Sequence, residues 1–139
     1  MPTGLRPSTP AEICVDRLFF VVAAVAGFIG VALGAFAAHG LKSRLEPDLL
    51  AAFETGVRYQ MYHVFALFAA AWGQVRWNGR WFGIAGWLFV AGIVLFSGSL
   101  YLLALTGERW LGAVTPVGGL AFLGGWLCLA WGARDKLAA

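Results

Sequence analysis

The sequence predicts an all-α integral membrane protein, an antiparallel four-helix bundle with both termini on the same side. Three observations support this fold class. Of the 139 residues, 60% are hydrophobic and 12% are charged, whereas globular domains carry about 25% charged residues. The mean hydropathy is +0.77. Four apolar runs, each near the ~20 residues needed to cross a bilayer, alternate with short polar connections.

The charged residues and the cysteines argue against several classes of partner. Ten basic and seven acidic residues give a net charge of +3, and the basic residues are scattered between the apolar runs, so we do not expect nucleic acid as a partner. The two cysteines, Cys14 and Cys128, are too few for a disulfide framework and form no CxxC metal motif. We therefore expect no metal and no cofactor.

The first predicted helix spans about 16–39 and follows a proline-rich, irregular tail over 1–15; the four-helix domain covers 16–136. Its apolar run exceeds the ~7–15 residues typical of a signal peptide and fits a membrane span. We expect the helix to end near His39, with Gly40 in a left-handed cap. Small residues at three- and four-residue steps suit one side for close packing: Ala23, Gly27, Gly30, Gly34 and Ala38.

The second predicted helix, about 48–73, is the most polar of the four. It begins after Pro47 with Asp48 in its first turn, where a carboxylate is favourable. An unpartnered arginine at mid-depth of a bilayer costs at least ~2.5 kcal/mol, so Arg58 needs a partner or access to the surface. Glu54 lies four residues earlier and offers a local ion pair; substrate or lipid binding by Arg58 is the alternative.

The third and fourth predicted helices span about 81–106 and 110–133, and an Asn-Gly turn flanked by interfacial tryptophans precedes the third. Pro116, near the start of the fourth run, should free a carbonyl one turn back and kink that helix, and Thr115 is available to bond that carbonyl. Glycines suited to close packing in the fourth helix are Gly118, Gly119 and Gly125.

The distribution of basic residues predicts the orientation. Four spans place both termini on one side, and that side carries Arg6, Arg17, Arg76, Arg80, Arg134 and Lys136, against Lys42, Arg44, Arg58 and Arg109 opposite. Because positive residues concentrate on the cytoplasmic side, we expect a multi-pass protein of the bacterial inner membrane with both termini in the cytoplasm.

Alternation of the helices brings their polar residues to one end of the bundle, the non-cytoplasmic end in this orientation. They form a candidate ligand-binding or interhelical polar cluster: His39, Arg58, Tyr59, Gln60, His63, Ser97, Ser99, Tyr101 and Thr115. Three interpretations of His63 stay open: an interhelical hydrogen bond, a role with protons or quinone, and haem or metal ligation together with His39. The hydroxyl groups are expected to bond backbone or neighbouring helices, with substrate contact as the alternative.

Four motifs in order resemble one protein family: residues 38–41, residues 56–60 with His63, residues 96–101, and residues 115–119 with Gly124-Gly125-Trp126. The chain resembles an uncharacterised family of small four-helix bacterial inner-membrane proteins, a domain of unknown function with a small relative in animal mitochondria. The resemblance covers about Val21 to Ala133. It implies an integral membrane protein with four helices, and it supplies no activity to carry across.

The sequence contains no catalytic constellation of a known type, such as a GxSxG elbow, HExxH, a Walker loop or paired intramembrane carboxylates. We therefore expect a non-catalytic protein, an accessory or stabilising subunit packed in the lipid bilayer against a larger inner-membrane assembly of respiratory or photosynthetic type. The alternative is binding or transport of a small hydrophobic ligand, quinone or lipid, at the polar cluster.

Overall fold

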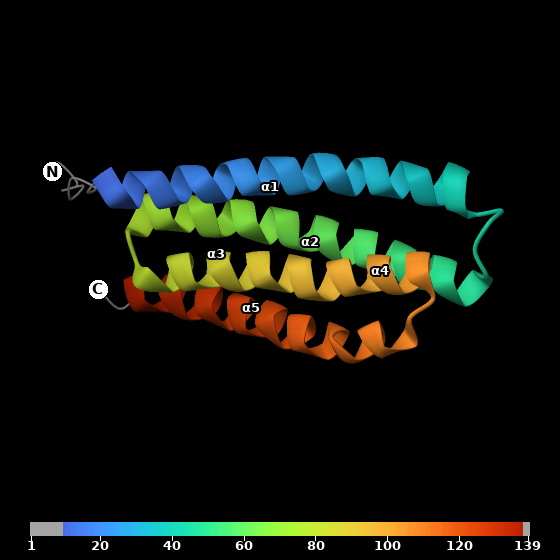
Figure 1. Cartoon of the computed structure of the whole chain (residues 1–139). Coiled ribbons are helices and arrows are strands. Elements are labelled where there is room, and N and C mark those ends of the chain that lie inside the picture. Colours follow the sequence, from blue (N-terminus) through green and yellow to red (C-terminus); the bar gives the residue numbers. More distant parts are fainter. Residues whose placement is uncertain (1–9, 138–139) are drawn as a thin grey trace, which may run out of the picture.

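The computed structural model describes residues 10–137, with side chains described for 17–134. Four helical rods run antiparallel (Figure 1), and the described residues contain no strand, which confirms the predicted all-α fold class. Their elements are α1 (Pro10–Phe36) with the π-helical η1 (Ala37–Leu41); α2 (Pro47–Trp77); α3 (Arg80–Gly92), the π-helical η2 (Ile93–Ser97) and α4 (Gly98–Thr106); and the 3-10 helix η3 (Arg109–Ala113) with α5 (Thr115–Leu137).

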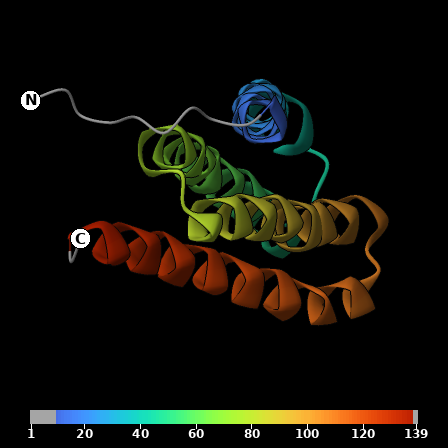
Figure 2. The same ribbon diagram turned by 90° about the vertical axis from the view of Figure 1, so that its left-hand side faces the viewer.

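The four rods are arranged in chain order. α1 packs along α2, α2 packs against α3 and α4, and α3 packs against α5, so that α1 and α5 lie at opposite edges of the bundle (Figure 2). The third rod is continuous, because α3, η2 and α4 follow one another without a break. α2 and this third rod therefore form the centre of the molecule.

Within the described residues, three segments are long and apolar enough to cross a membrane: Arg17–Leu41, Arg80–Thr106 and Arg109–Arg134. α2 is not among them, because polar side chains interrupt its apolar pattern. It lies between α1 and the third rod, so neighbouring helices can hold those side chains away from hydrocarbon. The fourth crossing thus depends on packing more than on hydropathy.

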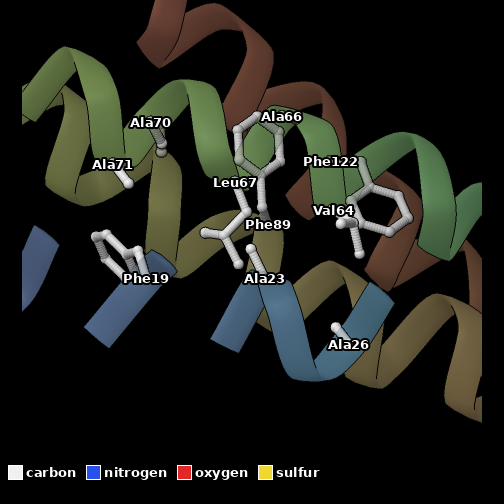
Figure 3. Packing of buried hydrophobic residues seen from close by; sticks show 11 residues of the cluster. Phe19, Ala23, Ala26, Val64, Ala66, Leu67, Ala70, Ala71, Phe89 and Phe122 are labelled. Atoms are coloured by element: carbon white, nitrogen blue, oxygen red, sulfur yellow. The ribbon is translucent and has the colours of Figure 1, made fainter. Parts of the chain in front are cut away.

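In the core, aromatic rings pack against glycines of neighbouring helices. Figure 3 shows the main cluster, in which Phe19, Leu67 and Phe89 are fully buried. A Cβ added at Gly125 would lie 2.5 Å from the ring of Phe89, so the ring occupies the volume of the missing side chain. Phe19 lies in the same way against Gly86. Close packing of this kind is typical of helices that associate in a membrane.

α2 packs against the small-residue side that the sequence predicts for the first helix. An added Cβ at Gly27 would lie 3.4 Å from Val64, one at Gly30 would lie 2.6 Å from the sulfur of Met61, and one at Gly34 would lie 3.4 Å from Val57. In the fourth helix, Gly118 lies directly against the backbone of Phe96, where a Cβ would overlap its nitrogen. Gly119 is different, because the nearest atom would be 3.8 Å from its Cβ.

The ends of the first helix differ from the expectation. α1 begins at Pro10, before the expected start near residue 16, and residues 1–9 of the expected irregular tail lie outside the described residues. The predicted left-handed cap at Gly40 is wrong: among described residues only Asn78 and Gly107 have positive φ. A π turn continues the helix instead, closed by the amide of Lys42 donating to the carbonyl of Ala37 at 3.1 Å.

Pro116 does not kink a helix. α5 begins at Thr115, so the proline lies in the first helical turn, where a missing amide hydrogen costs no intrahelical bond. The 3-10 segment η3 precedes it and ends at Ala113, two residues before α5 begins. Thr115 does not bond a freed carbonyl, since its hydroxyl bonds Ser99.

Candidate functional site

Five of the predicted polar residues form three interhelical hydrogen-bond groups: Gln60, His63, Ser99, Tyr101 and Thr115. The first is centred on Gln60, which is 4% exposed. Its amide nitrogen donates to the carbonyl of Ala26 in α1 at 2.7 Å, and its amide oxygen accepts from the hydroxyl of Tyr101 in α4 at 2.9 Å. One side chain of α2 is thus hydrogen-bonded to both neighbouring rods. These bonds keep a strongly polar amide out of contact with hydrocarbon.

The second group joins the third rod to α5. The hydroxyls of Ser99 and Thr115 lie 2.9 Å apart, and the Ser99 hydroxyl donates to the carbonyl of Phe96 at 3.0 Å. Ser97 is fully buried, and among described residues its hydroxyl has no hydrogen-bond partner. Its backbone carbonyl lies 3.3 Å from where a Cβ of Gly56 would be, so the third rod closely approaches α2 here.

The third group is centred on His63, which is 4% exposed. Its Nδ1 lies 2.7 Å from the carbonyl of Tyr59, and its Nε2 lies 3.2 Å from the indole nitrogen of Trp126. An indole nitrogen only donates and a carbonyl only accepts, so His63 is the neutral tautomer with hydrogen on Nδ1. The imidazole also stacks on Phe122, with ring centroids 3.4 Å apart and planes at 6°.

His39 takes no part in this group. It is exposed in η1, and its Nδ1 lies 3.0 Å from the carbonyl of Ala35. Since Gly27 faces Val64, the residue after His63, the rise of about 1.5 Å per residue places His39 roughly 18 Å further along α1. The two histidines therefore do not share a haem or metal site. In the described part of the chain, no group of three His, Cys, Asp or Glu residues is close enough to hold a metal.

Arg58 also stands apart from the hydrogen-bond groups. It is exposed on α2, and the local ion pair expected with Glu54 does not form. Between residues 17 and 134, the single ion pair joins Asp48 to Arg109 at 3.4 Å, at the end of the bundle, with both side chains exposed. Arg58 is therefore a charged side chain without a protein partner among the described residues.

A groove beside His63 includes predicted site residues in its wall. Its volume is about 760 Å³, within the ~300–1,000 Å³ typical of small-molecule sites. It lies between α2 and α5, with η2 contributing Phe96. Tyr59 and His63 bring the predicted cluster into its wall. The full lining is Tyr59, Tyr62, His63, Phe96, Pro116, Gly119, Leu120, Phe122, Leu123 and Trp126.

A second groove of about 630 Å³ lies between α1 and α2 at the other end of the bundle. It is lined by Arg17, Phe20, Phe68, Ala71, Trp72 and Val75, and includes none of the predicted site residues.

Comparison with known proteins decides the family. A family model described as "Protein of unknown function (DUF423)" matches residues 33–119. The chain belongs to this family. A UPF0382 membrane protein of Staphylococcus haemolyticus is 46% identical, over 81% of this chain and 92% of that protein. YwdK of Bacillus subtilis, also a UPF0382 membrane protein, is 44% identical over 81% and 93%. The UPF0382 inner membrane protein YgdD of Escherichia coli is 43% identical over 85% and 90%.

No solved structure matches the chain. The resemblance drawn from the four motifs is confirmed by the DUF423 match and the UPF0382 relatives. Together with the three apolar helices, the relatives identify a membrane protein of unknown function.

The groove also contains residues that lie outside the predicted polar cluster. Tyr62, Phe96, Phe122 and Trp126 were missed as site residues, because an aromatic side chain in an apolar run is ordinarily core or lipid-facing. Two signals were present: Tyr62 follows Arg58 by one helical turn, and Trp126 follows the Gly124-Gly125 pair. Neither indicates a groove without the packing of α5 against α3.

Proposed function

We propose that this membrane protein is non-catalytic and binds the apolar chain of a lipid or quinone in the groove between α2 and α5. The observation that carries the proposal is the groove itself, whose wall combines exposed apolar side chains with two tyrosines and the edge of a buried histidine. Tyrosine and tryptophan present an apolar body and a polar tip, which suits a ligand with a long chain and a small head.

The dimensions of the groove support a membrane-derived ligand. Its wall on α5 runs from Pro116 to Trp126, about 15 Å at 1.5 Å per residue. One leaflet contributes half of the ~30 Å hydrocarbon thickness, also about 15 Å. A chain that lies along the groove would thus extend from the level of Pro116 to the level of Trp126, about the thickness of one leaflet.

The hydrogen bonds support a binding role over catalysis. Both nitrogens of His63 are engaged, one with the carbonyl of Tyr59 and one with Trp126, so neither is available as a general base in this arrangement. Gln60 and Tyr101 are similarly bonded to each other. These polar side chains shape the groove and hold its walls together.

Filling the groove tests the proposal. Gly119 lines it and has room for a side chain, so Gly119→Leu should block chain binding while the protein still folds. Gly98→Leu is the matched control, because no atom lies within 4 Å of its would-be Cβ and it lies outside this groove. Native mass spectrometry of protein extracted gently from its own membrane should detect a bound lipid or quinone on the wild type and on Gly98→Leu, and less on Gly119→Leu. Equal ligand on all three would contradict the proposal.

A second candidate function is that of an accessory subunit of a larger inner-membrane assembly, respiratory or photosynthetic in type. The observation that favours it is the exposure of apolar side chains at the two edges of the bundle. Phe28 of α1 is 77% exposed, and Leu127 of α5 is 72% exposed. The same extraction tests it: a stoichiometric complex of other chains would support this function, and a lone chain in native lipid would argue against it.

A further inference from the structure

The unpaired charge of Arg58 lies beside the mouth of the groove. Arg58 precedes Tyr62 by four residues, so the two side chains share one face of α2, and Tyr62 lines the groove. Both are exposed. Tyr59, whose ring centroid lies 6.0 Å from that of Tyr62, forms the adjacent wall. A cation and two hydroxyl-bearing rings therefore meet at one end of an apolar channel.

The depth of Arg58 corresponds to the headgroup side of the hydrocarbon. Val57 faces Gly34 of α1, and the apolar run of α1 continues only to about Ala38, which puts Arg58 roughly 6–8 Å inside the end of that run. Side chains on a helix tilt toward its N-terminus, which for α2 is the nearer membrane surface. The guanidinium can thus reach the headgroups while its stem stays in hydrocarbon.

We propose that the ligand of the groove is an anionic lipid whose phosphate binds Arg58 and whose chain lies between α2 and α5. This inference rests on the proposed function and specifies the class of its ligand. A planar guanidinium offers paired donors that match phosphate oxygens, and Arg58 has no carboxylate partner among the described residues. A quinone carries no charge and would leave this cation unmatched.

Two features together favour a lipid over other anions: the positive charge of Arg58 and the apolar groove that begins beside it. A free phosphate would use Arg58 and leave the apolar groove unfilled. An acidic side chain of another protein would compensate the charge, but the groove runs from the headgroup level toward Trp126, along the direction in which a lipid chain extends. One molecule with a phosphate head and an apolar tail satisfies both features.

The test compares an anionic and a zwitterionic lipid that share the same acyl chains. The purified full-length protein in detergent is titrated with phosphatidylglycerol or with phosphatidylcholine of the same acyl chains, and bound lipid is counted by native mass spectrometry. We expect the wild type to bind the anionic lipid about fivefold more tightly, equivalent to about 1 kcal/mol for one basic residue near the surface. Arg58→Gln should abolish this preference and still bind both lipids, and Arg58→Lys should retain it in large part.

The controls separate this inference from the proposed function. Arg44→Gln removes an exposed charge from the η1–α2 connection and should leave the preference intact. Inorganic phosphate at millimolar concentration should not compete with the lipid. A preference that survives Arg58→Gln, or that free phosphate removes, would overturn the inference while the groove remains a binding site. Unchanged binding of both lipids to Gly119→Leu would instead overturn the proposed function itself.

Discussion

The indole nitrogen of Trp126 donates a hydrogen bond to Nε2 of His63 across 3.2 Å, linking the outer helix α5 to the central helix α2. These two helices otherwise share few contacts, because α3 lies between most of their length. The bond, the stacked Phe122 and the rim formed by Trp126 therefore define how far α5 can move from α2, and with it the width of the groove.

Removing the donor of this bond should leave a buried nitrogen unpaired. We expect Trp126→Phe to lower the free energy of unfolding by about 1 kcal/mol, the range measured for interhelical hydrogen bonds in membranes. Denaturant titration in detergent micelles measures this. Trp131→Phe, at an exposed position of the same helix, is the control and should cost less. In a His63→Phe background the cost of Trp126→Phe should shrink; an undiminished cost would mean that ring packing, and not the hydrogen bond, stabilises this contact.

The bond between Gln60 and Tyr101 should show a measurable coupling. Tyr101→Phe deletes the hydroxyl and leaves the amide oxygen of Gln60 unpaired, which should destabilise the protein by about 0.6–1.7 kcal/mol. Gln60→Leu removes both of the interhelical bonds of that side chain and should cost more. In the double variant the two losses should be less than additive. Tyr62→Phe, which removes an exposed hydroxyl, should have little effect on stability.

Two adjacent glycines should respond oppositely to the same change. Gly118→Ala would place a methyl group against the backbone of Phe96 and push α5 away from η2. We therefore expect it to lower the free energy of unfolding by about 1–3 kcal/mol. The added Cβ of Gly119→Ala meets no atom closer than 3.8 Å. This substitution should be neutral or slightly stabilising, since alanine has a higher helix propensity than glycine. Thermal unfolding of both variants in detergent decides this. Similar losses in the two would show that the close approach at Gly118 is not the cause.

The orientation and the crossing of α2 can be tested together. A fluorescent protein that matures only in the cytoplasm, fused to the C-terminus, should fluoresce, because the basic residues favour cytoplasmic termini. The same reporter inserted after Ser43, in the η1–α2 connection, should stay dark. Fluorescence at both places would mean that one of the three rods between them does not cross, as expected if α2 does not span the membrane. Fluorescence at Ser43 alone would mean that the protein has the reverse orientation.

Hydropathy and residue spacing predict four helical rods, three of them apolar enough to cross a membrane, and the short polar connections favour antiparallel neighbours. The crossing of the more polar α2 does not follow from hydropathy alone. The pairing of polar side chains could not be predicted in the same way. His39 and His63 belong to the same set by sequence, yet η1 holds one at the bundle end while the other is buried against Phe122. Which hydroxyl meets which partner depends on packing order and rotation about each helix axis, and spacing alone determines neither.

Arg58 illustrates the same limit. Its spacing from Glu54 predicts an ion pair, but both side chains are exposed and form no ion pair with each other. The gain from an exposed pair at this spacing is only a few tenths of a kcal/mol, too little to fix two flexible side chains. The groove, in turn, depends on Gly119 and Leu120 of α5 lying opposite Tyr59 and Tyr62, which are about 60 positions away in the sequence.

The π-helical turn of η2 determines how the third rod would respond to a change in its length. The amide of Gly98 bonds the carbonyl of Ile93, five residues back, so this turn holds one more residue than an α-helical turn would. Deleting one residue of this turn would turn the bond into the i→i−4 bond of a regular α-helix and leave the rod after it in nearly the same orientation. Tyr101 would then still face Gln60, and Ser99 would still face Thr115. A deletion within α3 or α4 would instead rotate everything after it by about 100° and should disrupt the fold far more.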